Sequence, residues 1–331
     1  MSFKILSLDG GGIRGILPGQ ILIALEAKLQ KLSGDPNARL GDYFDMVAGT
    51  STGAILASAY ICPDRNGQLK FSAKDAVDFY LQNGSAIFKV GFFRNLRTLW
   101  SFLDEKISEK KLEQILESAF GDTRLSELTK ATCLLSYDIN KRKPVIFAQH
   151  DALRKNEDFY VKDLLRASSA APTIFKSAQV ESLGDNRKRL DLIDGGVVAN
   201  NPTLCAYSEA VKFEVVNGIK DLMILSLGTG RELQAYTYSK AKNWGLLSWT
   251  KPLLDIALEG GPQMIDYHMD KIVSTVENAK FYRIQPSLYD ADTALDNGSK
   301  KNIEKLRLAG LKNAEKYNDV LDEVAQILIN D

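Results

Sequence analysis

Short apolar runs alternate along the chain with stretches whose apolar residues recur at helical spacing. The runs that predict strands are residues 3–8, 45–48, 132–137, 144–149, 189–193, 222–227 and 281–284. Several of these runs are apolar at successive positions, which is typical of strands that helices cover on both sides. The alternation predicts an α/β layered fold with a largely parallel sheet.

The end of the chain carries an amphipathic helical pattern over residues 299–330. The apolar positions that repeat at helical spacing are Ile303, Leu306, Leu311, Ala314, Tyr317, Leu321, Val324 and Leu328. This spacing predicts a C-terminal helix that packs on the core. The polar stretches 33–40 and 182–187 separate no regions of different composition, so we interpret them as loops and expect a single domain over residues 1–331. A cap or lid is expected from residues 85–125 and 236–270.

Composition and charge narrow the choice of partners and compartment. The 331 residues include 42 basic and 42 acidic side chains, so no global field attracts nucleic acid or an anionic bilayer. Cys62, Cys133 and Cys205 lie far apart without metal-ligand spacing, which favours reduced thiols. No stretch approaches the ~20 apolar residues of a membrane span, and the first strand begins too early for a secretory signal. We therefore expect a cytoplasmic protein.

A glycine loop follows the first predicted strand. Gly10, Gly12 and Gly15 spell G-x-G-x-x-G, a pattern that in dinucleotide-binding folds requires an acidic residue at the end of a second strand about 20 residues later. Asp35 stands at that distance, but it lies in the turn-forming stretch "LSGDPN", into which no strand leads. Asp9 would in addition repel a pyrophosphate. Nucleotide binding stays an alternative, with thermal stabilisation by NAD as its test.

The same loop suits a short-lived anion better. Gly10, Gly11 and Gly12 expose backbone amides just before a helix that we expect to begin at Pro18, and Arg14 partly offsets the charge of the preceding aspartate. Such amides can stabilise the oxyanion of a tetrahedral acyl intermediate.

A second glycine motif presents a candidate nucleophile. Gly49, Ser51 and Gly53 form G-x-S-x-G between a short apolar strand and a helical run of small residues. This is the strand-turn-helix context of a nucleophile elbow, in which the glycines permit a strained turn and the helix N-terminus favours negative charge. A serine hydroxyl still needs a neighbouring base.

Two residues compete for the role of that base. Asp194 closes a predicted strand and is followed by Gly195 and Gly196, at the end of the sheet where α/β proteins place their sites. His268 completes the chain order of an α/β-hydrolase triad, although it falls at the edge of a helical stripe, where a packed or rim histidine is the simpler interpretation. The residues alone leave both bases open.

Taken together, these motifs resemble the patatin-like phospholipases. The blocks are "DGGGIRG" from Asp9, "GTSTG" from Gly49 and "DGG" from Asp194, accompanied by "RASSAAPTIF", "GGVVANNP" and "LSLGTG". The resemblance covers roughly the first 230 residues. It implies a three-layer α/β/α sandwich, akin to the catalytic domain of cytosolic phospholipase A2, and a phospholipase A-type lipid acyl hydrolase that needs no metal or organic cofactor.

The resemblance also implies roles for residues of this chain. Ser51 would be the nucleophile and Asp194 the general base of a Ser/Asp dyad, in place of a triad. The oxyanion hole would be formed by Gly10, Gly11 and Gly12. The supporting positions would be Arg14, Gly49, Gly53, Gly195 and Gly196.

A dyad makes a prediction about pH. The ordinary pKa of an aspartate, about 3.9, makes a weak base, so we expect Asp194 to be partly desolvated. Because no imidazole would titrate, activity is expected to survive below the ~6.5 at which a histidine base protonates.

Two segments mix aromatic and basic side chains in a way that suits a membrane interface. They are "FKVGFFRNLRTLWSFL" from Phe88 and "YSKAKNWGLLSWTKPLL" from Tyr238. Packing of a cap on the core is an equally good interpretation of both. We expect a phospholipid or galactolipid substrate, peripheral membrane contact and no nucleic acid. The alternatives are a soluble esterase or thioesterase that uses Ser51, Asp194 and His268, and a lipid-binding protein without turnover.

Overall fold

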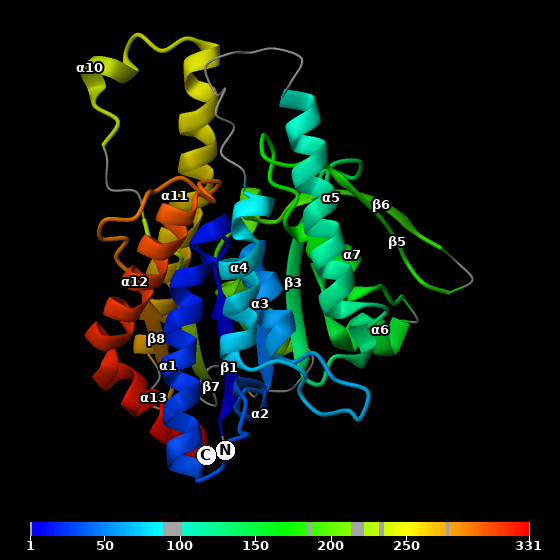
Figure 1. The fold of residues 1–331 in the computed structure, drawn as a ribbon, viewed down its shortest axis with the longest axis vertical. Helices are drawn as coiled ribbons and strands as arrows, with labels where there is room; N and C mark the ends of the chain where they lie inside the picture. The colour runs from blue at the N-terminus through cyan, green and yellow to red at the C-terminus, as the bar shows by residue number, and fades with distance from the viewer. Residues whose placement is uncertain are drawn as a thin grey trace.

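The computed structural model describes residues 2–88, 101–155, 157–184, 187–212, 222–231, 235–275 and 278–330. Its centre is an eight-stranded sheet in the order β5-β6-β3-β2-β1-β7-β8, with β4 paired to β3 as well (Figure 1). The strands are β1 Phe3–Leu8, β2 Met46–Thr50, β3 Ala131–Asp138, β4 Lys143–Phe147, β5 Ala178–Glu181, β6 Arg189–Asp194, β7 Leu222–Leu227 and β8 Lys280–Ile284. The pairs among β3, β2, β1, β7 and β8 are parallel, so the sheet is largely parallel, as predicted.

Helices cover both faces of this sheet. The described helices are α1 Ile16–Ser33, α2 Leu40–Tyr43, α3 Thr52–Tyr60, α4 Ala73–Ile87, α5 Ser101–Phe120, α6 Gln149–Lys155, α7 Val161–Ser168, α8 Gly196–Ala199, α9 Thr203–Lys212, α10 Tyr238–Ala241, α11 Leu246–Ser274, α12 Lys300–Lys316 and α13 Asn318–Asn330, with 3-10 turns at Gly12–Gly15 and Leu125–Glu127. Along β1, Leu6 and Leu8 join a large apolar cluster with α1, α3 and α4, whereas Ile5 joins a smaller cluster with α9 and α11. Alternate side chains of one strand thus pack into two apolar cores, one on each face of the sheet, which confirms the α/β/α layering.

The seven predicted strands are all present, with ends shifted by at most two residues. The strand before the elbow extends to Thr50, because the parallel ladder to β3 continues to the residue before Ser51. β5 was not predicted. It spans only four residues with alternating burial, and it is held by pairing with β6, which the local sequence does not reveal.

Two helix predictions need correction. α1 begins at Ile16 and not at Pro18, since the first turn of a helix tolerates a proline whose missing N–H would have no intrahelical partner. The predicted C-terminal helix 299–330 is two helices that meet at Tyr317, and Leu311 is exposed instead of packed. Both helices contact α1, and a break between them lets each lie against it.

The two ends of the described chain lie together at one end of the sheet, where β1 begins (Figure 1). The parallel strands therefore finish at the opposite end, where the starts of α5 and α11 project beyond the sheet. None of the helices in the described residues is long and apolar enough to span a bilayer.

Candidate active site

Ser51 occupies a sharp turn between β2 and α3. Its backbone has φ 54° and ψ −122°, a conformation that costs energy for a residue with a side chain. The turn is held because the amides of Ala54 and Ile55 donate to the Ser51 carbonyl at 2.9 and 3.2 Å. Glycine is required on both sides of the turn, since a Cβ at Gly49 would lie 2.4 Å from the Gly53 carbonyl oxygen and one at Gly53 would lie 2.1 Å from that of Leu8. The predicted elbow is therefore present.

Strand register brings Asp194 to Ser51. β2 pairs with β3 up to Thr50, opposite Leu135, while β6 pairs with β3 from Ser136 onward, and Asp194 stands opposite Ser136. β4 pairs with β3 over Leu134–Asp138, and so occupies the other edge. β2 and β6 must consequently pair with the same edge of β3, and the pairing with β6 begins at the residue after the last one that pairs with β2. Asp194 follows the last β2 position along that edge, and its side chain hydrogen-bonds to that of Ser51.

Asp194 is buried with few polar partners. Besides the contact with Ser51, its Oδ1 accepts a hydrogen bond from the Gly196 amide at 2.7 Å. Within the described ranges, no lysine or arginine pairs with this carboxyl. Burial raises the pKa of Asp194 from 3.8 to about 7, because these hydrogen bonds lower it less than desolvation raises it. A carboxyl with this pKa can take up and return a proton near neutral pH.

This value changes the expected pH behaviour. The prediction that activity survives below ~6.5 assumed a base with a lower pKa than histidine. A carboxyl with a pKa of about 7 protonates in the same range as an imidazole, so the acid limb of a pH profile does not separate the dyad from the triad. Substitution of His268 is the measurement that does.

The glycine loop packs against the elbow. One of its amides holds the loop in place, and the next two have no acceptor within the part of the chain that the structure describes. The Gly10 amide donates to the Asn200 carbonyl at 3.0 Å, so it is engaged in holding the loop. The Gly10 carbonyl in turn accepts from Thr229 Oγ1 at 2.8 Å. Among the described residues, the amides of Gly11 and Gly12 have no acceptor. Of the three predicted donors, these two are the ones that remain available to an oxyanion.

Close packing explains why this loop is glycine. A Cβ at Gly11 would lie 2.2 Å from Thr229 Oγ1, and one at Gly12 would lie 2.3 Å from the Leu295 carbonyl oxygen. Gly12 also has φ +55°, in the left-handed region. Gly195 is equally restricted, since its Cβ would meet the Leu135 carbonyl at 2.5 Å.

A pocket of about 50 Å³ opens over Ser51, Asp194 and the glycine loop. Its walls are mainly apolar and come from α4, α5 and the segment after α7. The side chains that make these walls are Phe79, Ile87, Phe88, Leu112, Ile174 and Phe175. A mainly apolar pocket with a few polar groups at one end is typical of a ligand site. The lining suits a hydrocarbon chain.

A further serine supports the elbow and was not predicted individually. Ser168, at the end of α7, accepts a hydrogen bond from the Ser51 amide at 2.9 Å and donates to the Leu135 carbonyl at 2.6 Å. It belongs to the quoted block "RASSAAPTIF", so the block marked the position without revealing its contact.

Asp9 has a different partner from the one expected. Arg14 lines the pocket and donates to the Thr293 carbonyl at 3.2 Å. The charge of Asp9 is met by Arg283 on β8, whose Nη1 and Nη2 lie 3.0 and 2.5 Å from the two carboxylate oxygens. Burial raises the pKa of Asp9, and the Arg283 guanidinium acts to lower it.

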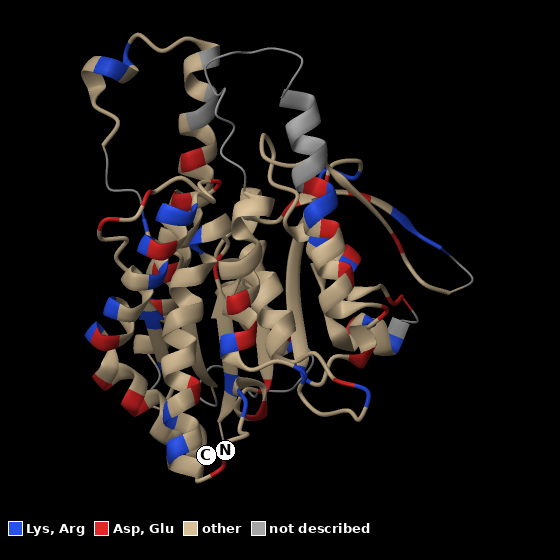
Figure 2. Cartoon of the chain, in the orientation of Figure 1, with Lys and Arg blue, Asp and Glu red and all other residues tan. Residues whose placement is uncertain are grey.

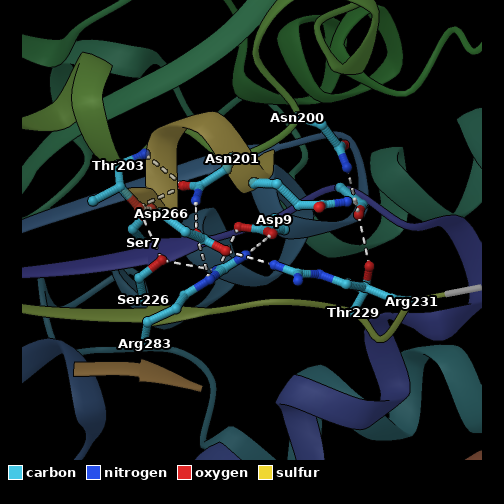
Figure 3. Close-up of polar contacts among 12 residues, drawn as sticks. Ser7, Asp9, Asn200, Asn201, Thr203, Ser226, Thr229, Arg231, Asp266 and Arg283 are labelled. Atoms are coloured by element: carbon cyan, nitrogen blue, oxygen red, sulfur yellow. Dashed lines mark hydrogen bonds and ion pairs between the residues drawn. The ribbon is translucent and has the colours of Figure 1, made fainter. Parts of the chain in front are cut away.

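Arg283 is the centre of a buried polar network below the glycine loop (Figure 3). Its Nε lies 2.8 Å from Asp266 on α11, and Arg231 pairs with the other oxygen of Asp266 at 2.6 Å. Asn201, just after α8, donates to Asp266 at 2.9 Å. The network ties β8 and α11 to the end of β1. The sequence motifs gave no sign of it, because its members are up to 274 residues apart.

His268 does not join the candidate site. It lies exposed on α11 with its ring edge-on to that of Tyr267, and it is not among the residues that line the pocket. The predicted helical stripe beside it is present, with Met269 fully buried. The arrangement speaks against a triad with Ser51 and Asp194.

The structure does not support the alternative of a dinucleotide site, which requires an acidic residue at the end of a second strand. Asp35 is exposed in the turn after α1, where its carboxylate accepts from the Asn37 amide at 2.8 Å. It is thus engaged in local turn geometry and does not end a strand.

The other histidine belongs to a separate charged cluster. His150, Asp151 and Glu209 place one ligand atom each within 4.8 Å of one another. The Lys212 ammonium already lies 3.1 Å from Glu209 and 3.8 Å from Asp151. Since this cation balances the cluster, we assign it no metal.

The cysteines are free, as predicted. Cys62 and Cys133 are buried and Cys205 is half-buried. Burial raises the pKa of all three thiols, which disfavours the reactive thiolate.

Comparison with known proteins gives a consistent result. The model of the family "Patatin-like phospholipase" matches residues 6–207. "Patatin-like protein 1" of Arabidopsis thaliana is 37% identical, over 93% of this chain and 80% of its own. "Probable inactive patatin-3-Kuras 1" of Solanum tuberosum is 32% identical, over 98% and 92% of the two chains. Similarity to these relatives therefore continues beyond residue 231, past the blocks noted in the sequence.

Among solved structures, VipD from Legionella pneumophila matches with a TM-score of 0.43 and 12% identity. The match covers 96% of this chain and 67% of that one.

Proposed function

Because this chain belongs to the patatin-like phospholipase family, we propose that it hydrolyses fatty acyl esters of membrane phospholipids or galactolipids through an acyl-enzyme on Ser51. The family supports a lipid hydrolase in general terms. The bond cleaved and the dyad are our inference from the site. One observation carries it: the side chain of Ser51 is hydrogen-bonded to a buried carboxyl with a pKa of about 7, at the polar end of an apolar pocket.

Acylation would begin when Asp194 takes the proton of Ser51 Oγ. The freed electron pair forms the bond to the ester carbonyl carbon, and the carbonyl oxygen becomes negative. The amides of Gly11 and Gly12 face this oxygen, and each such donor is typically worth about 3 to 4 kcal/mol of barrier. The intermediate then expels the lysolipid alkoxide, which takes the proton back from Asp194.

Deacylation would use the same groups in turn. Asp194 removes a proton from water as the water oxygen attacks the acyl carbon on Ser51. The intermediate expels Ser51 Oγ, which recovers its proton from Asp194, and the fatty acid leaves. The N-terminus of α3 faces the nucleophile and favours the negative charge that develops in both steps.

The apolar walls explain the choice of substrate class. An acyl chain that lies against Phe79, Phe88 and Phe175 would exclude water from the buried carboxyl and keep its pKa high. We propose that the protein reaches such chains by peripheral contact with a lipid surface.

Mass spectrometry of the products from phosphatidylcholine and galactolipid vesicles tests this function. We expect free fatty acid and lysolipid from the wild-type protein and none above background from Ser51→Ala. Ser208→Ala is a matched control, because Ser208 is exposed on α9 and bonds only its own helix.

A fluorophosphonate probe should label Ser51, and a labelled peptide that contains it is the direct readout. Hydrolysis of short-chain esters alone, without release from vesicles, would identify a soluble esterase instead. Absence of both labelling and hydrolysis would identify a lipid-binding protein without turnover and overturn the proposal.

A further inference from the structure

Exposed apolar side chains are concentrated on one part of the surface. Among the described residues, fifteen large apolar or aromatic side chains are exposed, and seven of them lie between Tyr236 and Tyr267. Five of the seven belong to α11, and we call them the docking stripe: Leu246, Leu253, Ile256, Met264 and Tyr267. Leu246 is 87% exposed and the others between 49% and 58%. Such a concentration on a folded surface indicates an interaction site.

The docking stripe is one continuous face of the helix. At 3.6 residues per turn, its five members fall within an arc of roughly 80°. Pro262 and Met269 are buried on the opposite side of α11, against the rest of the molecule. The apolar face that points away from the core is therefore as regular as the one that packs on it.

The described part of this outward face carries little charge. Between Leu246 and Tyr267, none of the exposed side chains that the structure describes is charged. The acidic residues of this part, Asp255, Glu259 and Asp266, are half-buried. Asp255 accepts from Tyr236 at 2.6 Å, and Asp266 belongs to the Arg283 network. Acidic groups that would repel an anionic surface are thus turned away from the docking stripe.

Basic and aromatic groups border the stripe where α11 begins. Figure 2 shows basic colouring at α10, the short helix next to this end. Lys240 lies on α10, and Lys242 follows the end of this helix. Tyr238 on the same helix is 82% exposed. Trp244 packs edge-on between Tyr236 and Trp249 at 5.3 and 5.0 Å and so connects the segments that flank α10 to α11. Aromatic rings with lysines beside an apolar face are typical of a helix that lies in a membrane interface.

The helix also reaches the pocket. Leu258, two residues after Ile256 of the docking stripe, lines the pocket over Ser51, and its carbonyl accepts from Asn200 at 2.9 Å. The start of α11 projects at the end of the sheet where the parallel strands finish, which is the end that carries the site (Figure 1). A surface bound by the docking stripe would lie beside the pocket.

We propose that the docking stripe, with Lys240 and Lys242, binds the surface of a lipid bilayer and holds the pocket next to its substrate. The inference rests on the proposed function for the identity of the substrate. It places part of the aromatic and basic segment that begins at Tyr238 at the membrane interface. The other candidate segment, with Phe92, Phe93 and Trp100, falls on residues 89–100, which lie outside the described residues, and the side chain of Phe102 is likewise not described.

Vesicle co-sedimentation of the Ser51→Ala protein tests binding without turnover. The stripe variant Leu246→Ser/Leu253→Ser/Met264→Ser should lower partition into phosphatidylcholine vesicles at least about tenfold, since each buried apolar group adds to interfacial binding. Leu308→Ser/Leu311→Ser on α12 is the matched control, because both leucines are exposed to 44–45% and lie away from the stripe. It should bind as the parent does.

The lysines give a second, independent readout. Lys240→Gln/Lys242→Gln should lower binding to vesicles with added phosphatidylserine by about fivefold per lysine, and leave binding to pure phosphatidylcholine unchanged. In the active protein, the stripe variant should hydrolyse a soluble short-chain ester at the parental rate while hydrolysing vesicles at least about tenfold more slowly.

Three results would overturn the docking proposal. They are a parent protein that does not bind vesicles, a stripe variant that binds them as the parent does, and a parental dimer in light scattering that the stripe substitutions dissociate without changing vesicle binding. The last would mean that a second copy covers the stripe. Failure of the proposed function would appear separately, as a wild-type protein without hydrolysis in any of the assays.

Discussion

Two buried carboxylates stand at the ends of neighbouring parts of the sheet and are held in contrasting ways. Asp9 follows β1, and both of its oxygens are bound by the guanidinium of Arg283. Asp194 closes β6 and is held by one backbone amide and by the hydroxyl of Ser51. Burial raises the pKa of both. Only one of them has a cation to oppose that effect.

The difference separates a structural charge from a reactive one. A carboxylate bound by a guanidinium on both oxygens is favoured in its ionised form and serves as a fixed support. A carboxyl that is equally buried but lacks a cation has a raised pKa, so its ionised form can accept the proton of a hydroxyl beside it and return it later. In this molecule, the first kind of carboxylate anchors the glycine loop and the second lies beside Ser51, the nucleophile that we propose.

The largest effect is expected when the reactive carboxyl is made neutral. Asp194→Asn should lower kcat/KM on a soluble ester by about 10²- to 10⁴-fold, because an amide cannot accept the proton of Ser51. Circular dichroism should show an unchanged fold. Asp191→Asn is the matched control, since Asp191 lies on the same strand and bonds Gln179 at 2.7 Å. An Asp194→Asn protein with near-parental turnover would exclude Asp194 as the base.

The structural carboxylate should respond in stability. Arg283→Met leaves Asp9 buried without its cation and Asp266 with Arg231 alone, and we expect the free energy of unfolding to fall by about 3–5 kcal/mol at neutral pH. Urea titration measures this.

Arg307→Met is the control for that experiment, because Arg307 pairs with Glu304 on the surface of α12. Such a pair is worth about 0–1 kcal/mol. If both substitutions had the same small effect, the network around Arg283 would be no more than a surface ion pair.

The pH dependence of activity and stability should run in opposite directions. The base works in its ionised form. Below a pH of about 7, kcat/KM is therefore expected to fall about tenfold for each pH unit. The folded pKa lies above the unfolded value of 3.8, so the stability that Asp194 contributes is complete below 3.8 and is lost as pH rises through about 7. Asp194→Asn should abolish this slope of stability with pH, which thermal melts at several pH values would detect. A slope that survives the substitution must come from another group.

The smallest effect is expected at His268. Because its ring is exposed and lies outside the pocket, His268→Gln should change kcat by less than about twofold, in line with other surface substitutions. Steady-state kinetics on the same ester measure this. A large loss of turnover with an intact fold would instead support a triad that includes His268. Asp194 would then not be the sole base.

Local patterns in the sequence were sufficient for features that lie within a few residues of each other. The elbow around Ser51 and the glycine loop depend on glycine at fixed short spacing, so both could be predicted. The parallel strands could be predicted as well, because long apolar runs such as 222–227 have few other uses. Asp194 was predicted from its position at the end of a strand.

Features made by distant residues were not accessible in this way. Nothing around Arg283 indicates that it binds Asp9, because the pair forms only when β8 is added to the sheet beyond β7. The role of Gly10 was also misjudged, since its amide meets a carbonyl 190 residues away. The break at Tyr317 and the exposure of Leu311 depend on how two helices share the surface of α1. In each case the missing information was tertiary.

The shared edge of β3 has a consequence for how this protein can change over time. Ser51 and Asp194 meet because two strands occupy consecutive places along one backbone, so their distance is set by ladder hydrogen bonds and not by the side chains around them. Helices and loops that do not contact the elbow can exchange residues without disturbing that distance. A single insertion or deletion within β6 would instead turn the carboxyl to the opposite face of the sheet. The number of residues in β6 is therefore as important for this site as the identity of the aspartate that ends it.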